Sequence, residues 1–135
     1  MSNTVNQINM IEDEYVPFAA EILVKDFDTS LEFYKRLLFE VLRIYKSDDY
    51  DFATLAFGKN ILMIKEDRRV HKSIDGSIIQ LRFIITDDLD NFYEHVQAQN
   101  IAILKPLSDI YYGLKRFSVS DPDGYEIKFG TKQTD

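Results

Sequence analysis

Few residues in this sequence have side chains that carry out covalent or metal chemistry. Among its 135 residues there is no cysteine, and the only histidines are His71 and His95. Thiolate nucleophiles, zinc–thiolate sites and iron–sulfur clusters require cysteine sulfur, and a three-histidine centre requires a third histidine. The 23 aspartates and glutamates leave a carboxylate metal site open. Neither histidine joins an apolar stripe, so both are predicted to lie on the surface and neither to be catalytic.

Lys128 has two open interpretations. Together with Gln80 it could bind a carboxylate or a phosphate, or it could form an ion pair with Glu21 or Glu126. A lysine that forms a Schiff base needs burial to depress the pKa of its ammonium group, and nothing in the sequence indicates such burial. The sequence therefore leaves anion binding and ion pairing as alternatives for Lys128.

Arg82 and Arg116 also suit anion binding, because a guanidinium group can donate two parallel hydrogen bonds to one carboxylate or phosphate. Pairing with Glu126 on a neighbouring strand is the alternative. Basic residues are otherwise scattered, and the formal net charge is −7. This balance argues against a broad nucleic-acid surface, which needs clustered lysine and arginine.

The first half of the chain predicts one strand, one helix and three strands. Residues 18–24 form an apolar run, and Thr29 with Glu32 make a capping box that opens a helix. The helix presents an apolar stripe of Leu31, Tyr34, Leu37 and Leu38. Strands are predicted over 41–46, 52–57 and 61–65.

The second half repeats this order. Residues 77–86 alternate, with Ile79, Leu81, Phe83 and Ile85 on one face and Gln80, Arg82, Ile84 and Thr86 on the other. Residues 87–90 open a helix with the stripe Leu89, Phe92, Tyr93 and Val96. Strands follow over 101–104, 115–120 and 126–129, and the last two are joined by a turn at 121–124.

Matching residues indicate an internal duplication. Asp26 and Asp87 are 61 residues apart, whereas the pairs 33–34 and 92–93, each Phe-Tyr, are 59 apart. We therefore expect the second copy to lack two residues at the start of its helix. The length and the 45% apolar content fit one domain over 16–131. Its modules are expected at about 16–66 and 77–131, with a linker at 67–76 and a polar leader at 1–15.

The strand–Asp–helix openings and the C-terminal motif together resemble the vicinal oxygen chelate superfamily, which includes glyoxalases, bleomycin-resistance proteins and extradiol dioxygenases. The motif reads Gly113-x-x-Arg116-Phe117-x-Val119-x-Asp121-Pro122-Asp123-Gly124-Tyr125-x-Ile127-x-Phe129. The resemblance implies an α+β fold in which two tandem βαβββ modules form a curved-sheet cleft. It also implies that a homodimer usually completes the cleft.

The resemblance places metal ligands on the cleft faces of the first and last strands of each module. The matching positions here are Ala19, Met63, Gln80 and Lys128. Alanine has no donor atom, a thioether is a poor ligand for hard divalent ions, and an ammonium group repels them. We therefore expect no metal and no cofactor, and the chain is closest to the metal-free, bleomycin-resistance-like branch.

This branch implies that the protein sequesters a polar organic ligand, as in antibiotic resistance, without a catalytic residue. By strand parity, the ligand-binding candidates are Glu21, Phe52, Met63, Gln80, Arg82, Arg116, Ser118, Glu126 and Lys128. Two alternatives stay open: a metal-dependent lyase, transferase or dioxygenase with atypical ligands, and an interaction module with a filled cleft. Without a signal sequence or a run of ~20 apolar residues, a cytoplasmic protein with no membrane partner is expected.

Overall fold

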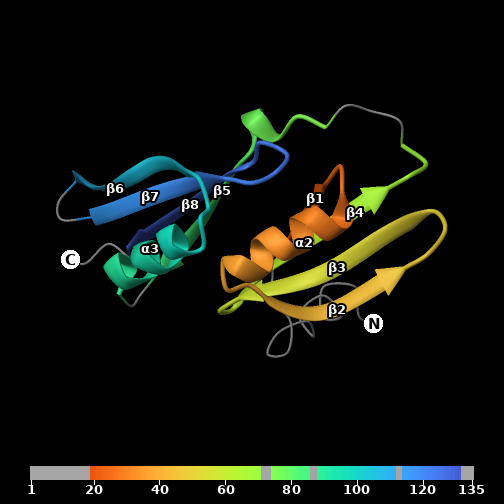
Figure 1. Ribbon diagram of the computed structural model, residues 1–135, viewed down its shortest axis with the longest axis horizontal. Coiled ribbons are helices and arrows are strands. Elements are labelled where there is room, and N and C mark those ends of the chain that lie inside the picture. Colours follow the sequence, from red (N-terminus) through yellow and green to blue (C-terminus); the bar gives the residue numbers. More distant parts are fainter. Residues whose placement is uncertain (1–18, 71–73, 86–87, 112–113, 132–135) are drawn as a thin grey trace, which may run out of the picture.

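Two four-stranded mixed sheets, each with one helix, make up the described chain (Figure 1). The computed structural model describes residues 19–70, 74–85, 88–111 and 114–131. The predicted leader, His71 and Asp87 lie outside these residues. None of the described helices is long and apolar enough to cross a membrane.

Each sheet has the same strand order, which confirms two tandem βαβββ modules. Sheet 1 runs β1-β4-β3-β2 and sheet 2 runs β5-β8-β7-β6. In each, the first strand pairs in parallel with the last and the other pairs are antiparallel. The elements of module 1 are β1 (Ala20–Leu23), α2 (Phe27–Arg36), β2 (Glu40–Lys46), β3 (Tyr50–Phe57) and β4 (Asn60–Asp67). Those of module 2 are β5 (Gln80–Ile85), α3 (Leu89–Ala98), β6 (Ile103–Tyr111), β7 (Leu114–Ser120) and β8 (Glu126–Thr131), preceded by the 3₁₀ turn η1 (Gly76–Ile78).

The start of α2 differs from the prediction. Asp26 is the N-cap, and its carboxylate accepts a hydrogen bond from the Thr29 backbone N–H at 3.2 Å. The capping box led by Thr29 is therefore wrong, and the helix begins two residues before Thr29. A second acceptor favours this earlier start, because Glu66 of β4 accepts from the Phe27 N–H at 2.7 Å.

The two helices also correct the predicted alignment of the modules. Both have ten residues, with N-caps at Asp26 and Asp88. Both end before a residue with positive φ, Leu38 at 69° and Asn100 at 58°. The N-caps and the positive-φ residues are each 62 residues apart (88 − 26 and 100 − 38), whereas the buried residues of the preceding strands, Ile22 and Phe83, are 61 apart (83 − 22). Module 2 therefore carries one extra residue before its helix, not two fewer. Leu38 is 57% exposed, so it does not belong to the predicted apolar stripe.

The strands correct the predictions at their ends. β6 extends well past the expected end at residue 104, while β5 begins at Gln80 because residues 76–78 form the 3₁₀ turn. The expected turn at 121–124 is confirmed, with the Gly124 N–H donating to the Asp121 carbonyl at 3.0 Å and Gly124 at φ 94°. Glycine suits this turn because φ is positive there.

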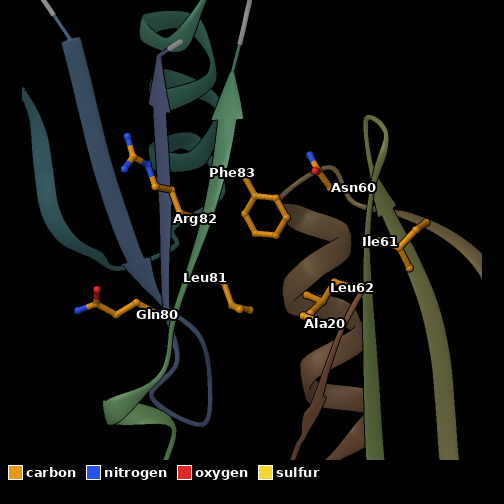
Figure 2. Close-up of a pocket in the computed structure, with 8 residues that line it drawn as sticks. All are labelled: Ala20, Asn60, Ile61, Leu62, Gln80, Leu81, Arg82 and Phe83. Carbon is orange, nitrogen blue, oxygen red and sulfur yellow. The ribbon is translucent and has the colours of Figure 1, made fainter. Parts of the chain in front are cut away.

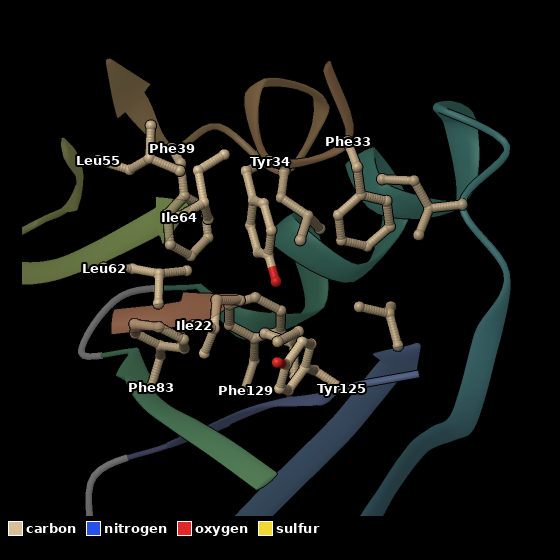
Figure 3. Close-up of a cluster of buried hydrophobic side chains, with 14 of the residues drawn as sticks. Ile22, Phe33, Tyr34, Phe39, Leu55, Leu62, Ile64, Phe83, Tyr125 and Phe129 are labelled. Atoms are coloured by element: carbon tan, nitrogen blue, oxygen red, sulfur yellow. The ribbon is translucent and has the colours of Figure 1, made fainter. Parts of the chain in front are cut away.

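One apolar core runs across both modules (Figure 3). Phe57 from module 1 lies with its ring centre 5.6 Å from Phe83 and 5.4 Å from Phe129, both of module 2. Phe39 also meets Phe83, at 5.3 Å. The two sheets are therefore held together by the same burial of aromatic surface that stabilises each of them.

Buried polar contacts also join the modules. The hydroxyl of Tyr34, in α2, donates to Asp121 Oδ2 at 2.7 Å. The other carboxylate oxygen of Asp121 accepts the backbone N–H groups of Asp123 and Tyr125 at 2.8 and 2.9 Å. The Tyr125 hydroxyl donates to the carbonyl of Leu23, at the end of β1, at 2.8 Å. The turn of module 2 is thus fixed against the strand and helix of module 1.

Candidate functional site

Strand alternation places the predicted site residues on the faces of the sheets turned away from the helices, here called the open faces. On β1, Ile22 is buried in the core while Glu21 is exposed, and on β5 Phe83 is buried while Arg82 is exposed. Register extends this parity across each sheet. Three candidates lie on the open face of sheet 1, namely Glu21, Phe52 and Met63. Six lie on that of sheet 2, namely Gln80, Arg82, Arg116, Ser118, Glu126 and Lys128.

The open face of sheet 2 carries a row of cations. Cα pairing sets Arg82 beside Lys128, Lys128 beside Ser118, and Ser118 beside Lys105, so the row crosses all four strands. We call Arg82, Lys128, Ser118 and Lys105 the cationic row. The equivalent row of sheet 1, here called the matching row, consists of Glu21, Met63, Thr54 and Arg43.

Glu126 is buried on the same open face, 7% exposed, and its carboxylate has three partners. Ser118 Oγ donates to it at 2.8 Å and Gln80 Nε2 at 3.2 Å. The Lys105 ammonium lies 3.2 Å away. Burial acts to raise the pKa of Glu126, but the hydrogen bonds from Ser118 and Lys105 outweigh it, so the pKa lies below its usual value. Glu126 therefore holds a negative charge that the protein itself neutralises.

Lys105 is the site residue that the sequence did not indicate. Residues 101–104 were predicted as a strand, and Pro106 and the polar residues after Leu107 break the apolar alternation. In the structure β6 continues to Tyr111 through several register shifts, and one of them brings Lys105 opposite Ser118. The only signal in the sequence was that Lys105 follows directly after the predicted end of the strand.

Of the alternatives left open for Arg82, Arg116 and Lys128, ion pairing with Glu126, or of Lys128 with Glu21, is not what the described residues show. In the part of the chain that the structure describes, the ion pairs within 4 Å include Lys105 with Glu126 and none of those three cations. Lys128 lies near enough to Glu126 to help lower the pKa of its carboxyl group. Arg82 is exposed, whereas Arg116 and Lys128 are half-buried.

The candidates do not share one hollow of the chain. A crevice of about 330 Å³ between the modules is lined by Gln80 and Arg82, with Leu62, Leu81 and Phe83 among its apolar residues. Figure 2 shows Leu81 and Phe83 pointing into the gap, while Gln80 and Arg82 point away from it. On sheet 2, Lys105, Arg116, Ser118, Glu126 and Lys128 surround only a depression too small to hold a water molecule. Glu21, Phe52 and Met63 line neither.

His95 lies between the two helices. Its Nε2 atom is 3.1 Å from the carbonyl oxygen of Arg36, so this nitrogen carries the hydrogen and donates it. The side chain is half-buried, which corrects the expectation of a fully solvated histidine. Its role is to join α3 to the end of α2, on the helix side of the sheets and away from the open faces.

A family model matches most of the chain. The Glyoxalase/Bleomycin resistance protein/Dioxygenase superfamily model covers residues 8–129. The chain belongs to this superfamily. No curated protein matches it.

Several solved structures share the fold. A glyoxylase/bleomycin resistance protein/dioxygenase domain from Frankia sp. EAN1pec is 18% identical, with a TM-score of 0.72 over 85% of this chain and 90% of that one. A glyoxalase/bleomycin resistance protein/dioxygenase from Alicyclobacillus acidocaldarius is 20% identical, with a TM-score of 0.69 over 91% and 96%. TioX from Micromonospora sp. ML1 is 21% identical, with a TM-score of 0.68 over 89% and 98%.

The positions that the superfamily resemblance assigns to metal ligands can be checked against the sheet register. Met63 lies opposite Glu21, two residues after Ala19, and Lys128 lies opposite Arg82, two residues after Gln80. Met63 and Lys128 are thus equivalent positions in the two modules. Alanine, methionine and lysine supply no oxygen or nitrogen donor that fits a hard divalent ion. Glu126, beside Gln80, already binds the Lys105 cation, so the residues present do not fit such a metal.

Proposed function

We propose that the protein binds a small polar organic molecule on its open sheet faces, without a metal ion and without converting it. The observation that supports this most directly is the set of side chains at the four ligand positions, Ala19, Met63, Gln80 and Lys128. Superfamily chemistry that relies on a metal to polarise a substrate oxygen lacks its ligands here. A binding protein needs only shape and polar groups that fix its ligand.

The open faces offer those groups in two separate sets. Sheet 1 contributes apolar surface from Phe52 and Met63 with the carboxylate of Glu21, and sheet 2 contributes the cationic row. A second copy of the chain, placed so that sheet 1 of one faces sheet 2 of the other, brings both sets to one cleft. The proposal therefore includes a homodimer, and exposed apolar residues on both faces, Leu23 at 38% and Ile84 at 43%, support it.

The test uses amide NMR spectra of ¹⁵N-labelled protein. We expect small aromatic probes that carry a negative, positive or neutral group to shift the amides of β3, β4, β5, β7 and β8. Treatment with a chelator should leave the binding unchanged, and metal analysis should find no stoichiometric ion. Sedimentation should give the mass of a dimer.

Two outcomes would contradict the proposal. A stoichiometric divalent ion whose removal abolishes binding would favour a metal-dependent enzyme. Absence of any probe-induced shift on either open face would favour an interaction module whose cleft is filled by side chains.

A further inference from the structure

We infer that the cationic row binds the anionic group, a carboxylate or a phosphate, of a small ligand with a flat apolar body. This inference rests on the proposed function and specifies which class of molecule the site accepts. Three observations support it. The open face of sheet 2 is positively charged, most of its cations have no carboxylate partner among the described residues, and an apolar surface lies beside them.

The open face of sheet 2 is positive in an acidic protein. The chain has a formal net charge of −7, yet this face combines four cations with one carboxylate. The cations are Arg82, Lys105, Arg116 and Lys128. Because Glu126 binds Lys105, the remaining three have no carboxylate within 4 Å among the described residues. A local positive charge of this kind attracts anions and repels cations of similar size.

The arrangement costs the protein stability unless an anion is present. Arg82 and Lys128 are directly opposite on adjacent strands, where like charges repel. The matching row of sheet 1 avoids this conflict, since Glu21 and Met63 occupy the equivalent pair. A bound carboxylate or phosphate would accept hydrogen bonds from both cations and remove their repulsion.

The surface next to the row suits an apolar body. Two residues further along each strand, Ile84 on β5 lies beside Gly130 on β8, and Gly130 lies beside Arg116 on β7. Gly130 is buried, whereas Ile84 is 43% exposed. A ring that packs against Ile84 would bring its anionic group to the cationic row.

The experiment compares benzoate and phenyl phosphate with two probes of the same size, neutral benzyl alcohol and cationic benzylamine. Affinities are measured by NMR titration for the parent protein and for the Arg82→Gln, Lys128→Gln and Ile84→Ala variants. Lys35→Gln is the control, because Lys35 is an exposed cation on α2, away from both open faces. Circular dichroism checks that each variant is folded.

We expect the anionic probes to bind at least ten times more tightly than the other two. Lys128→Gln and Arg82→Gln should each weaken anion binding roughly tenfold, whereas Lys35→Gln should not change it. Ile84→Ala should weaken binding less, through the lost apolar surface. The tighter of benzoate and phenyl phosphate identifies the preferred anion.

Several results would overturn the inference. Equal affinity for benzyl alcohol or benzylamine would refute it while leaving the proposed binding function intact. Unchanged anion binding in Lys128→Gln would show that the row is not the site. Tighter binding of a single-stranded oligonucleotide than of phenyl phosphate, with a steep salt dependence, would point to nucleic acid instead. Absence of binding by every probe would refute both the inference and the proposed function.

Discussion

The two sheets have the same strand order but differ in what their open faces carry. In the row that faces the core, sheet 1 has Ile22, Ile64 and Ala53, and sheet 2 has Phe83, Phe129 and Phe117. All six are buried and apolar. On the open side, the matching row has one acid, one cation and two uncharged residues, whereas the cationic row has three cations and a serine.

This contrast separates the residues that determine the fold from those on which the proposed binding depends. The core-facing rows must exclude water, so both modules use apolar residues there. The open rows carry no such requirement, and a duplicated framework can therefore present different charges at equivalent positions. A single charge-specific face on one module suits an asymmetric ligand, with one polar end and one apolar end, better than a symmetric one.

The largest expected effect tests whether the two modules unfold as one unit. Phe129→Ala removes a fully buried ring that contacts Phe57 of the other module, and should cost about 3–5 kcal/mol of unfolding free energy. Because the core is continuous, urea unfolding followed by circular dichroism and by tyrosine fluorescence should remain one transition. As a control, Leu104→Ala, at a site 50% exposed, should change stability by less than about 0.5 kcal/mol. Two separate transitions would show that the modules unfold independently.

The next effect concerns the polar contact between the modules. Tyr34→Phe leaves Asp121 Oδ2 without its buried donor and should cost about 1–2 kcal/mol. Urea unfolding measures this, with Tyr45→Phe as a control because Tyr45 is 49% exposed. Equal effects of the two substitutions would mean that the contact between Tyr34 and Asp121 adds nothing to stability.

Acid titration should separate two carboxylates, Asp67 of module 1 and Asp121 of module 2, by the sign of their effect on stability. In module 1, paired hydrogen bonds from Arg69 lower the pKa of Asp67 to about 2 from an ordinary 3.8. Its stabilisation is present above pH 3.8 and is lost as the pH falls toward 2. In module 2, burial raises the pKa of Asp121. The folded chain then binds this proton more tightly than the unfolded chain, so stability falls as the pH rises from 3.8 through the folded pKa.

Two neutral variants check these signs. Relative to the parent, Asp67→Asn should lose less stability between pH 4 and pH 2, and Asp121→Asn should lose less as the pH rises above 4. Urea midpoints measured from pH 2 to pH 7 give both differences. In Asp121→Asn, part of the decrease in stability above pH 4 should persist, because burial raises the pKa of the Asp123 carboxyl group as well. The opposite sign for either variant would contradict the assigned environment.

The sequence predicted those features that depend on local alternation. Parity on β1 and β5 placed Glu21 and Arg82 on the open faces, because burial alternates along any strand that covers a core. It failed where distant groups decide the outcome. Asp26 and Thr29 are both good N-caps, and an acceptor 39 residues from Phe27, on Glu66, accompanies the earlier start.

Lys105 was missed for a related reason. Its place opposite Ser118 depends on a register shift between Ile103 and Lys105. The shift puts these two residues on opposite faces although they are two apart, so regular alternation continued from Ile103 gives the wrong face for Lys105. The sequence therefore offered partners for Glu126 only among residues whose face of the sheet followed from regular alternation. For the same reason, no local sequence pattern predicted the hydrogen bond between Tyr34 and Asp121, which are 87 residues apart.

The smallest effect on stability comes from making the two rows alike. Lys128→Met installs the residue that Met63 provides in sheet 1, and it removes the like charge on the strand position opposite Arg82. The long apolar stem of the lysine is largely retained, so packing should persist. Unfolding free energy should rise by up to about 1 kcal/mol, while benzoate and phenyl phosphate binding weakens. A loss of stability instead would mean that the attraction of Lys128 for Glu126 exceeds its repulsion from Arg82, and that the cationic row is a structural feature of sheet 2 before it is a binding one.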